Sequence, residues 1–201
     1  INAFALGAQE VNPDAKVVVR WIYNWFDPAG ATEATEALIA DGADVFAYTE
    51  DTPTVPQTAA ARGLVSFSHY ADMSQYAPDT LASGQLVHWG VLTTDILSKV
   101  MDGTYTADNL EDVDYFWLMA EGAVEAGIEP GVVIHPAYEE QLRAYMVETD
   151  AGTETVYDLV MRRIEQMTTS PVEFEPFAGP VSDRKGNVVY EEGQGPTMLD
   201  L

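Results

Sequence analysis

Several aromatic side chains in this sequence could bind a flat ligand. Trp21, Tyr23, Trp25 and Phe26 crowd one short stretch, and Trp89 follows later in the chain. A ring that stacks on a base contributes about 1–3 kcal/mol to binding. We expect Trp25 to face a pocket, and Trp21 and Phe26 to pack in the core. For Trp89 both roles remain open.

Acidic and imidazole side chains offer polar chemistry near the same positions. Asp72 can accept hydrogen bonds from sugar hydroxyls or from the amine of a base. Glu50 and Asp51 could act as a general acid and base, but the 33 acidic residues make such pairs common, which favours a hydrogen-bonding or exposed role. His69 and Asp72 could be two ligands of a metal site. No third ligand is evident, so a polar loop is favoured there.

The residue types that are missing exclude other classes of chemistry. The chain has 201 residues and no cysteine, which excludes disulfides, zinc–thiolate sites and thiol catalysis. It contains neither a G-x-S-x-G elbow nor a phosphate-binding glycine loop. We therefore expect no catalytic residue, no metal and no cofactor.

The net charge bears on the partners of the protein. The sequence has 33 acidic and 9 basic residues, which gives a formal net charge of −24. Such a field repels phosphate backbones, so we expect no nucleic-acid partner. It also argues against docking on anionic lipid through a basic patch. The acidic residues are scattered along the chain, which favours surface solvation in a salty environment over a cation site.

The elements that must position these side chains alternate between helix and strand patterns over the first seventy residues. β-branched runs predict strands over residues 16–22, 44–49 and 64–68. Helical patterns cover residues 1–9, 28–41 and 52–62. Asp27 is the expected N-cap of the second helix, Pro28 its first residue, and Gly42 its end.

This alternation predicts an α/β fold in which a parallel sheet has helices on both faces. Ligands bind such sheets in the crevice at the carboxyl ends of the strands. The predicted strand ends are followed by residues 23–27, 50–52 and 69–72. We therefore expect the functional site to be built from these three stretches.

The rest of the chain is less regular. Strand patterns occur at residues 85–89 and 114–119, and helical patterns at residues 92–101, 137–148 and 154–167. Residues 180–181 and 188–190 predict the two strands of a hairpin. We expect an exposed acidic loop at residues 106–114 and a crossing segment at residues 121–136.

Four stretches of the sequence, taken in order, resemble one known family. They are residues 1–28 (INAFALGAQEVNPDAKVVVRWIYNWFDP), 36–53 (EALIADGADVFAYTEDTP), 70–74 (YADMS) and 176–193 (PFAGPVSDRKGNVVYEEG). Over nearly its whole length, the chain is similar to the basic membrane protein (BMP) family of ABC-transporter substrate-binding lipoproteins.

The resemblance implies a type I periplasmic-binding-protein-like fold, in which two α/β lobes joined by crossing strands close on a ligand. Residues 1–78 would form most of lobe two, and residues 79–125 part of lobe one. Residues 126–201 would form the crossing segment, the C-terminal helices and the hairpin. By the same comparison, the chain lacks most of lobe one and the first strand of lobe two.

The resemblance also implies a binding site. Trp25 matches the aromatic residue that stacks on the purine in known members, and Asp72 matches an aspartate that binds ribose hydroxyls or the base edge. Tyr23 and Asn24 replace a Gly-Ser pair, which would narrow the pocket. Val87 stands where nucleoside-binding members often carry a lysine, so a free base such as adenine is as plausible as a nucleoside. The expected binding residues are Trp25, Asp72, Trp89, Glu50, Asn24 and His88.

The implied function is that of the extracytoplasmic solute-binding component of an ABC importer, not that of an enzyme. Its partners would be a purine-type small molecule and the ABC permease and ATPase subunits. The protein would lie in the periplasm or on the outer face of the plasma membrane, held only by a lipid anchor outside this chain. Two alternatives stay open: the ligand-sensing domain of a transcription regulator, and a nucleoside-processing enzyme.

Overall fold

The computed structural model describes residues 1–113, 115–183 and 185–195, which form two compact units. One unit combines Ile1–Val17 with the chain from Tyr145 onward, and the other spans Val18–Ala144. Each unit has its own helices and strands. The lobe boundaries at residues 78 and 125 remain a prediction.

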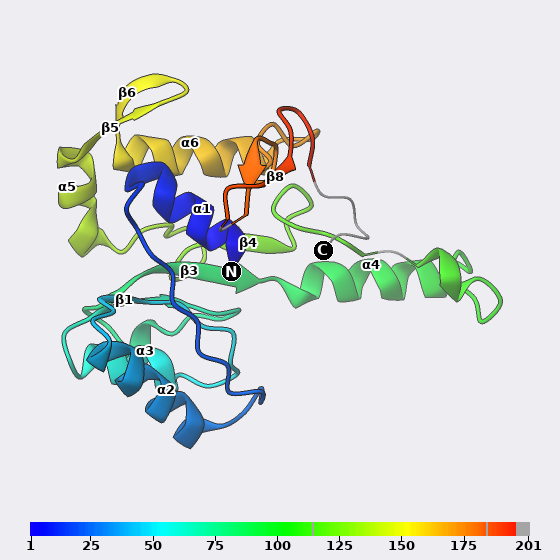
Figure 1. The fold of residues 1–201 in the computed structure, drawn as a ribbon. Helices are drawn as coiled ribbons and strands as arrows, with labels where there is room; N and C mark the ends of the chain where they lie inside the picture. Colours follow the sequence, from blue (N-terminus) through cyan, green and yellow to red (C-terminus); the bar gives the residue numbers. More distant parts are fainter. Residues whose placement is uncertain (114, 184, 196–201) are drawn as a thin grey trace. The chain divides into compact units, whose positions relative to one another are not determined.

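The Val18–Ala144 unit contains a four-stranded sheet in the order β1-β2-β3-β4 (Figure 1). Its strands are β1 (Val45–Phe46), β2 (Val65–Ser68), β3 (Leu81–Val87) and β4 (Val124–Ala126). The first three run parallel, and β4 pairs antiparallel with β3. The expected α/β class with a parallel sheet is confirmed. Because β1, β2 and β3 are parallel, their carboxyl ends lie at the same edge of the sheet.

Two helices, α2 (Pro28–Ala40) and α3 (Thr54–Ala60), lie on one face of this sheet (Figure 1). Asp27 caps α2 as predicted, because its Oδ1 accepts a hydrogen bond from Gly30 N at 3.0 Å. The buried cluster that joins the two helices to β1 consists of Ala31, Phe46, Val55 and Ala59. This cluster fixes the position of β1 against the helices.

A second buried cluster supports β3. Leu81 and Ala77 are completely buried, and Ile128 from the segment after β4 packs against them. β2 and β3 approach so closely that a Cβ on Gly84 would lie 1.7 Å from Oγ of Ser68. Because burial of a leucine side chain contributes about 1.5–3 kcal/mol, Leu81 anchors β3 at its first residue.

Helix α4 (Trp89–Met101) begins just after β3, and none of its described residues is buried. Gly103, at φ 81°, follows the helix as predicted. The next segment folds back onto α4 at Lys99, whose Nζ lies 2.8 Å from Oδ2 of Asp95 and 5.3 Å from the ring centre of Tyr105. The remaining short elements of this unit are η1 (Ser74–Tyr76), η2 (Leu110–Asp112) and α5 (Pro136–Ala144).

The other unit packs two helices and two hairpins. The helices are α1 (Asn2–Val11) and α6 (Val156–Thr168), and Glu10 of α1 forms an ion pair with Arg163 of α6. The hairpins are β5 (Met146–Thr149) with β6 (Gly152–Thr155) and β7 (Val181–Ser182) with β8 (Val188–Tyr190). The predicted C-terminal hairpin is therefore confirmed.

Two predicted strands are wrong. Residues 16–22 form no strand, although their β-branched side chains favour one. A strand needs a hydrogen-bonded neighbour, and in the described ranges no strand pairs with this segment. Residues 115–119 also lack strand structure, and Asp114 lies outside the described residues.

Several predicted boundaries are also wrong, and the strand expected at residues 44–49 covers only Val45–Phe46. The helix expected at residues 137–148 ends at Ala144, because residues 146–149 pair with residues 152–155 through a turn in which Gly152 has φ 101°. The helix expected from residue 154 begins at Val156. The strand expected at residues 85–89 covers Leu81–Val87 instead, and Trp89 opens a helix.

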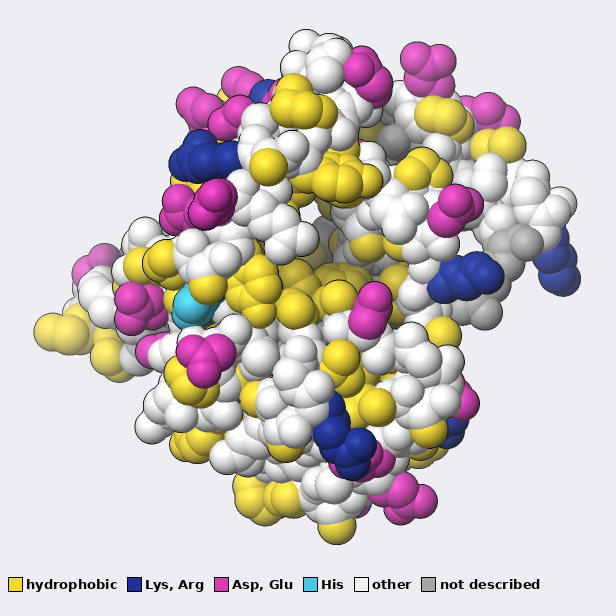
Figure 2. Space-filling model, turned by 90° about the vertical axis from the view of Figure 1, so that its left-hand side faces the viewer, with side chains coloured by type: hydrophobic (Ala, Val, Ile, Leu, Met, Phe, Trp, Pro, Cys, Tyr) yellow, Lys and Arg dark blue, Asp and Glu magenta, His cyan; other side chains and the backbone are white. Residues whose placement is uncertain are grey.

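Acidic side chains are spread over the face drawn in Figure 2 in separate groups, with few basic ones between them. This distribution agrees with their scattering along the sequence. Among the residues that the structure describes, no helix is long and apolar enough to span a membrane.

Candidate functional site

A cavity of about 570 Å³ lies at the carboxyl ends of the three parallel strands. Asp51 follows β1, residues 70–72 follow β2, and His88 and Trp89 follow β3. The full lining consists of Asp51, Tyr70, Ala71, Asp72, Leu86, Val87, His88, Trp89 and Pro130. The cavity thus occupies the place where parallel sheets bind ligands. Its size suits a small molecule.

Tyr70 and Trp89 form the aromatic part of the lining. Their ring centres lie 6.2 Å apart in an edge-to-face arrangement, and the exposed fractions of the two residues are 45% and 60%. Tyr70 has φ 61°, a left-handed conformation that costs a non-glycine residue about 1–3 kcal/mol. Its carbonyl accepts a hydrogen bond from Val87 N at 3.1 Å, which ties this strained residue to β3. The geometry leaves open ring surface at the cavity.

His69 supports Tyr70 from beneath. The two rings stack with their centres 3.7 Å apart, and Nδ1 of His69 lies 2.8 Å from Nε2 of Gln85. His69 is buried, and this burial lowers the pKa of its imidazole below 6.5. The possible metal pair with Asp72 gains no support: among the described residues, no three His, Asp or Glu side chains could hold a metal ion.

Two carboxylates, Asp51 and Asp72, line the same cavity. Oδ1 of Asp72 accepts a hydrogen bond from Ser74 N at 2.8 Å, which fixes the carboxylate in its loop. The lining in the described part of the chain includes neither lysine nor arginine. Acidic groups without a cation disfavour anionic ligands and favour ligands that donate hydrogen bonds.

His88 also lines the cavity and is paired with Glu125 of β4. Nε2 of His88 lies 2.8 Å from Oε2 of Glu125, and Oε1 of Glu125 accepts a hydrogen bond from Gly131 N at 2.6 Å. The bond from Gly131, together with His88, holds the pKa of Glu125 below its usual value of 4.5. The pair joins the end of β3 to β4.

Glu50, Asn24 and Trp25 do not line this cavity. Glu50 is buried, and its carboxylate accepts hydrogen bonds from Asp27 N and from the backbone and hydroxyl of Thr52. Asn24 accepts a hydrogen bond from Phe26 N at 3.1 Å. Both side chains therefore shape the loop in which they lie.

Trp25 lies in the same loop, with 69% of its surface exposed. Its carbonyl accepts a hydrogen bond from Asp51 N at 2.8 Å. This bond places the Trp25 backbone next to a residue of the cavity lining.

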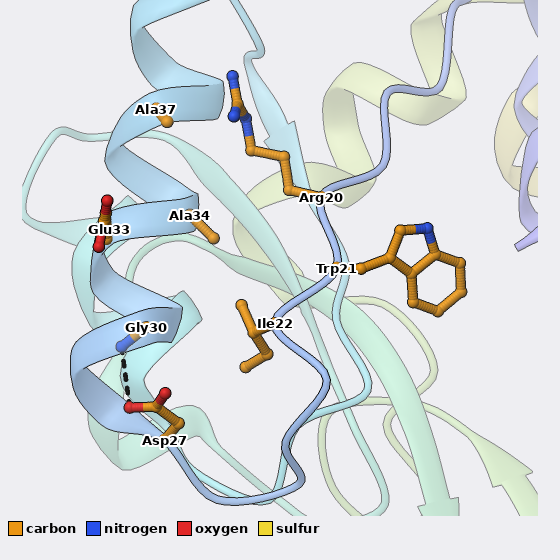
Figure 3. Close-up of a pocket in the computed structure, with 8 residues that line it drawn as sticks. All are labelled: Arg20, Trp21, Ile22, Asp27, Gly30, Glu33, Ala34 and Ala37. Carbon is orange, nitrogen blue, oxygen red and sulfur yellow. Dashed lines mark hydrogen bonds between the residues drawn. The ribbon is translucent and has the colours of Figure 1, made fainter.

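The expected core packing of Trp21 and Phe26 is wrong, because 64% and 67% of their surfaces are exposed. In Figure 3, Trp21 points away from α2, whereas Ile22 faces the helix. Ile22 packs against the core cluster beneath it. A second cavity of about 280 Å³ lies between this segment and α2. Within the described ranges no strand pairs with the segment, so Val18, Val19 and Trp21 stay exposed and Ile22 is only partly buried.

Asp51, Tyr70 and Glu125 were not among the site residues expected from the sequence. Asp51 and Tyr70 lie within the predicted strand-end stretches, so the position of these stretches was the available signal. Glu125 had no such signal. It reaches His88 only because β4 pairs antiparallel with β3, and that pairing joins distant parts of the chain.

Comparison with known proteins identifies the family. The family model described as "Bmp: ABC transporter substrate-binding protein PnrA-like" matches residues 1–133. The chain belongs to the Bmp family. The resemblance inferred from the sequence is therefore confirmed.

Two curated proteins are similar to this chain. A purine-binding protein of Brucella abortus is 31% identical over 96% of this chain and 48% of its own length. A putative ABC transporter glucose-binding protein of Haloferax volcanii is 35% identical over 64% of this chain and 30% of its own length. The chain thus spans about half the length of the first relative and less than a third of the second.

Two solved structures share the fold of this Bmp-family chain. A transcriptional activator of the comK gene from Bacillus halodurans has a TM-score of 0.62, with 82% of this chain and 50% of that chain covered. An ABC transporter solute-binding protein from Conexibacter woesei has a TM-score of 0.50, with 85% and 51% covered. Both are 16% identical, so they support the periplasmic-binding-protein-like fold alone.

Proposed function

We propose that the protein containing this chain is the solute-binding component of an ABC importer and captures a purine base or nucleoside. The observation that carries the proposal is the cavity at the ends of β1, β2 and β3, where two aromatic rings stand beside two carboxylates. Rings stack on a flat base, and carboxylates accept hydrogen bonds from amines or hydroxyls. Membership of the Bmp family and the purine-binding relative support the same ligand class.

Trp25 completes the proposed site. Its exposed indole stands on a loop whose backbone is bonded to Asp51, so it can approach a ligand in this cavity when the full-length protein closes. Asp72 accepts hydrogen bonds from ribose hydroxyls or from the base edge, and His88 adds a third polar group. Glu50 and Asn24 act indirectly, by holding the Trp25 loop.

The partners and location follow from the same proposal. The full-length protein works in the periplasm or on the outer face of the plasma membrane, where a lipid anchor holds it. It delivers its ligand to an ABC permease with its ATPase, and it performs no catalysis. The net charge of −24 fits a role without nucleic acid.

Calorimetric titration of the full-length protein tests the ligand class. Adenine, adenosine, adenosine monophosphate and glucose form the panel, because one relative is named as glucose-binding. We expect adenine or adenosine to bind with a Kd of about 1 μM or below, which corresponds to roughly 8 kcal/mol. The monophosphate should bind at least about tenfold more weakly, because the cavity lining in the described ranges has no basic side chain to neutralise a phosphate.

Binding of glucose without binding of any purine would overturn the purine assignment. Uptake gives a second test of the importer role. Cells that lack the protein should lose accumulation of radiolabelled adenine, and unchanged accumulation would contradict the proposal.

A further inference from the structure

His88 of the cavity lining is paired with Glu125 of β4, which lies outside the lining. Both oxygens of Glu125 are engaged, one with Nε2 of His88 and the other with Gly131 N. The two side chains are about one-third exposed, at 35% and 31%, so the contact is partly shielded from water. Glu125 is thus held firmly against the histidine.

A carboxylate can only accept hydrogen bonds, so Nε2 of His88 must carry the hydrogen that Glu125 receives. In a neutral imidazole the other nitrogen, Nδ1, is then an acceptor. Within the residues that the structure describes, no hydrogen bond is made to Nδ1 of His88. Because His88 lines the cavity, Nδ1 is the ring nitrogen left for a ligand to engage.

The other polar side chains of the lining include two further hydrogen-bond acceptors. Asp51 and Asp72 are acceptors as carboxylates, and the donors among the lining side chains are the Tyr70 hydroxyl and the Trp89 indole N–H. A ligand carbonyl directed at the histidine would meet a lone pair. A ligand amine at the same place would instead donate a hydrogen bond to it.

We propose that Glu125 is a positioning residue that fixes Nδ1 of His88 as an acceptor, and that the cavity thereby selects purines with an exocyclic amine over purines with a carbonyl at that position. The proposal rests on the proposed function, since it assumes a purine ligand. It adds a residue to the site, and it names the chemical feature by which this site distinguishes ligands.

Substitution of Glu125 by glutamine should turn Nδ1 of His88 from a hydrogen-bond acceptor into a donor. The glutamine carbonyl can still accept from Gly131 N, while its amide group donates to Nε2 of His88. The hydrogen of the imidazole then moves to Nδ1, which becomes a donor. Glu125→Gln should therefore weaken the binding of adenine and strengthen the binding of hypoxanthine. If Glu125 had a purely structural role, the variant would bind both purines more weakly, and to the same extent.

The test is calorimetry of the full-length protein with adenine and hypoxanthine. The wild type should prefer adenine by about tenfold, the size of one exchanged hydrogen bond, and Glu125→Gln should abolish or reverse this preference. Glu129→Gln is the matched control, because it removes the same charge from an exposed residue nearby and should leave the preference unchanged. Equal weakening of both ligands in Glu125→Gln would overturn the proposal.

A second variant and a second readout guard against misfolding. His88→Gln can keep the contact with Glu125 but lacks Nδ1, so it should also lose the preference for adenine. Nitrogen-15 NMR of His88 without ligand should show the hydrogen on Nε2 in the wild type and on Nδ1 in Glu125→Gln. A hydrogen on Nδ1 in the wild type would overturn the inference, whereas failure of the wild type to bind either purine would overturn the proposed function instead.

Discussion

The loop after β2 and the loop before α2 both present a tyrosine in the left-handed conformation, but their surroundings differ. Tyr70, at φ 61°, stacks on the buried His69 and is bonded to Val87 of β3. Tyr23, at φ 54°, is 92% exposed and stacks on the exposed Trp21. The first loop follows a paired strand and lines a cavity, whereas the second follows a segment without strand partners. The larger of the two cavities lies where paired strands end, whereas Trp21 of the unpaired segment lines only the smaller one.

The largest expected difference between the two regions is in stability. Leu81→Ala removes a completely buried side chain at the start of β3 and should lower the free energy of unfolding by about 2–5 kcal/mol. Val18→Ala, in the unpaired segment with 60% of its surface exposed, should change it by less than about 0.5 kcal/mol. Urea unfolding followed by circular dichroism measures both. Equal losses would mean that the segment is packed as firmly as β3.

The next difference concerns ligand binding by exposed tryptophans. Trp89→Ala should weaken adenine binding by about 1–3 kcal/mol, which is roughly five- to a hundredfold in Kd, because it removes a ring of the cavity. Trp21→Ala removes a ring of similar exposure outside the cavity and should leave the Kd unchanged. Fluorescence titration of the full-length protein gives both values.

Trp25→Ala tests whether the loop before α2 takes part in ligand binding. If Trp25 stacks on the ligand as proposed, the variant should also lose about 1 kcal/mol or more of binding free energy. A Kd equal to that of the wild type would confine the site to the loops after β1, β2 and β3. In that case the loop before α2 has no direct role in binding.

The smallest expected effect is the contribution of His69 to the pH dependence of the free energy of unfolding. Burial lowers the pKa of His69 below 6.5, so the unfolded chain binds a proton more readily than the folded one. The free energy of unfolding therefore has its full contribution from neutral His69 above the unfolded pKa. This contribution decreases as the pH falls from about 6.5 toward the lowered pKa of the folded state. His69→Gln should reduce this dependence in urea unfolding between pH 7 and about pH 5. An identical pH profile would show that His69 does not titrate as a buried group.

The parallel sheet and the position of its site follow from local sequence patterns. β-branched runs alternate with capped helices, so the end of β2 and the role of Asp27 could be predicted, whereas β1 ends at Phe46 and not at residue 49. The absence of a strand at residues 16–22 could not be predicted, because it depends on which neighbours are present to pair with it. For the same reason the expected burial of Trp21 and Phe26 was wrong, and both side chains are exposed.

Within the site, the residues after β2 could be predicted, and the contacts between distant segments could not. Asp72 follows from the strand-end rule and from the family resemblance. Glu125 acts on His88 only through the antiparallel register in which it lies opposite Leu86. That register comes from tertiary pairing, which local patterns do not encode.

The most direct test of the central claim, that the cavity at the strand ends binds the ligand, is calorimetry of Asp72→Ala with adenine in the full-length protein. Asp79→Ala is the matched control, since it removes an exposed carboxylate that lies outside the cavity lining. We predict that Asp72→Ala raises the Kd at least about tenfold, the effect of losing a hydrogen bond to a charged group, while Asp79→Ala leaves it unchanged. Equal affinity of Asp72→Ala and the wild type would contradict the account.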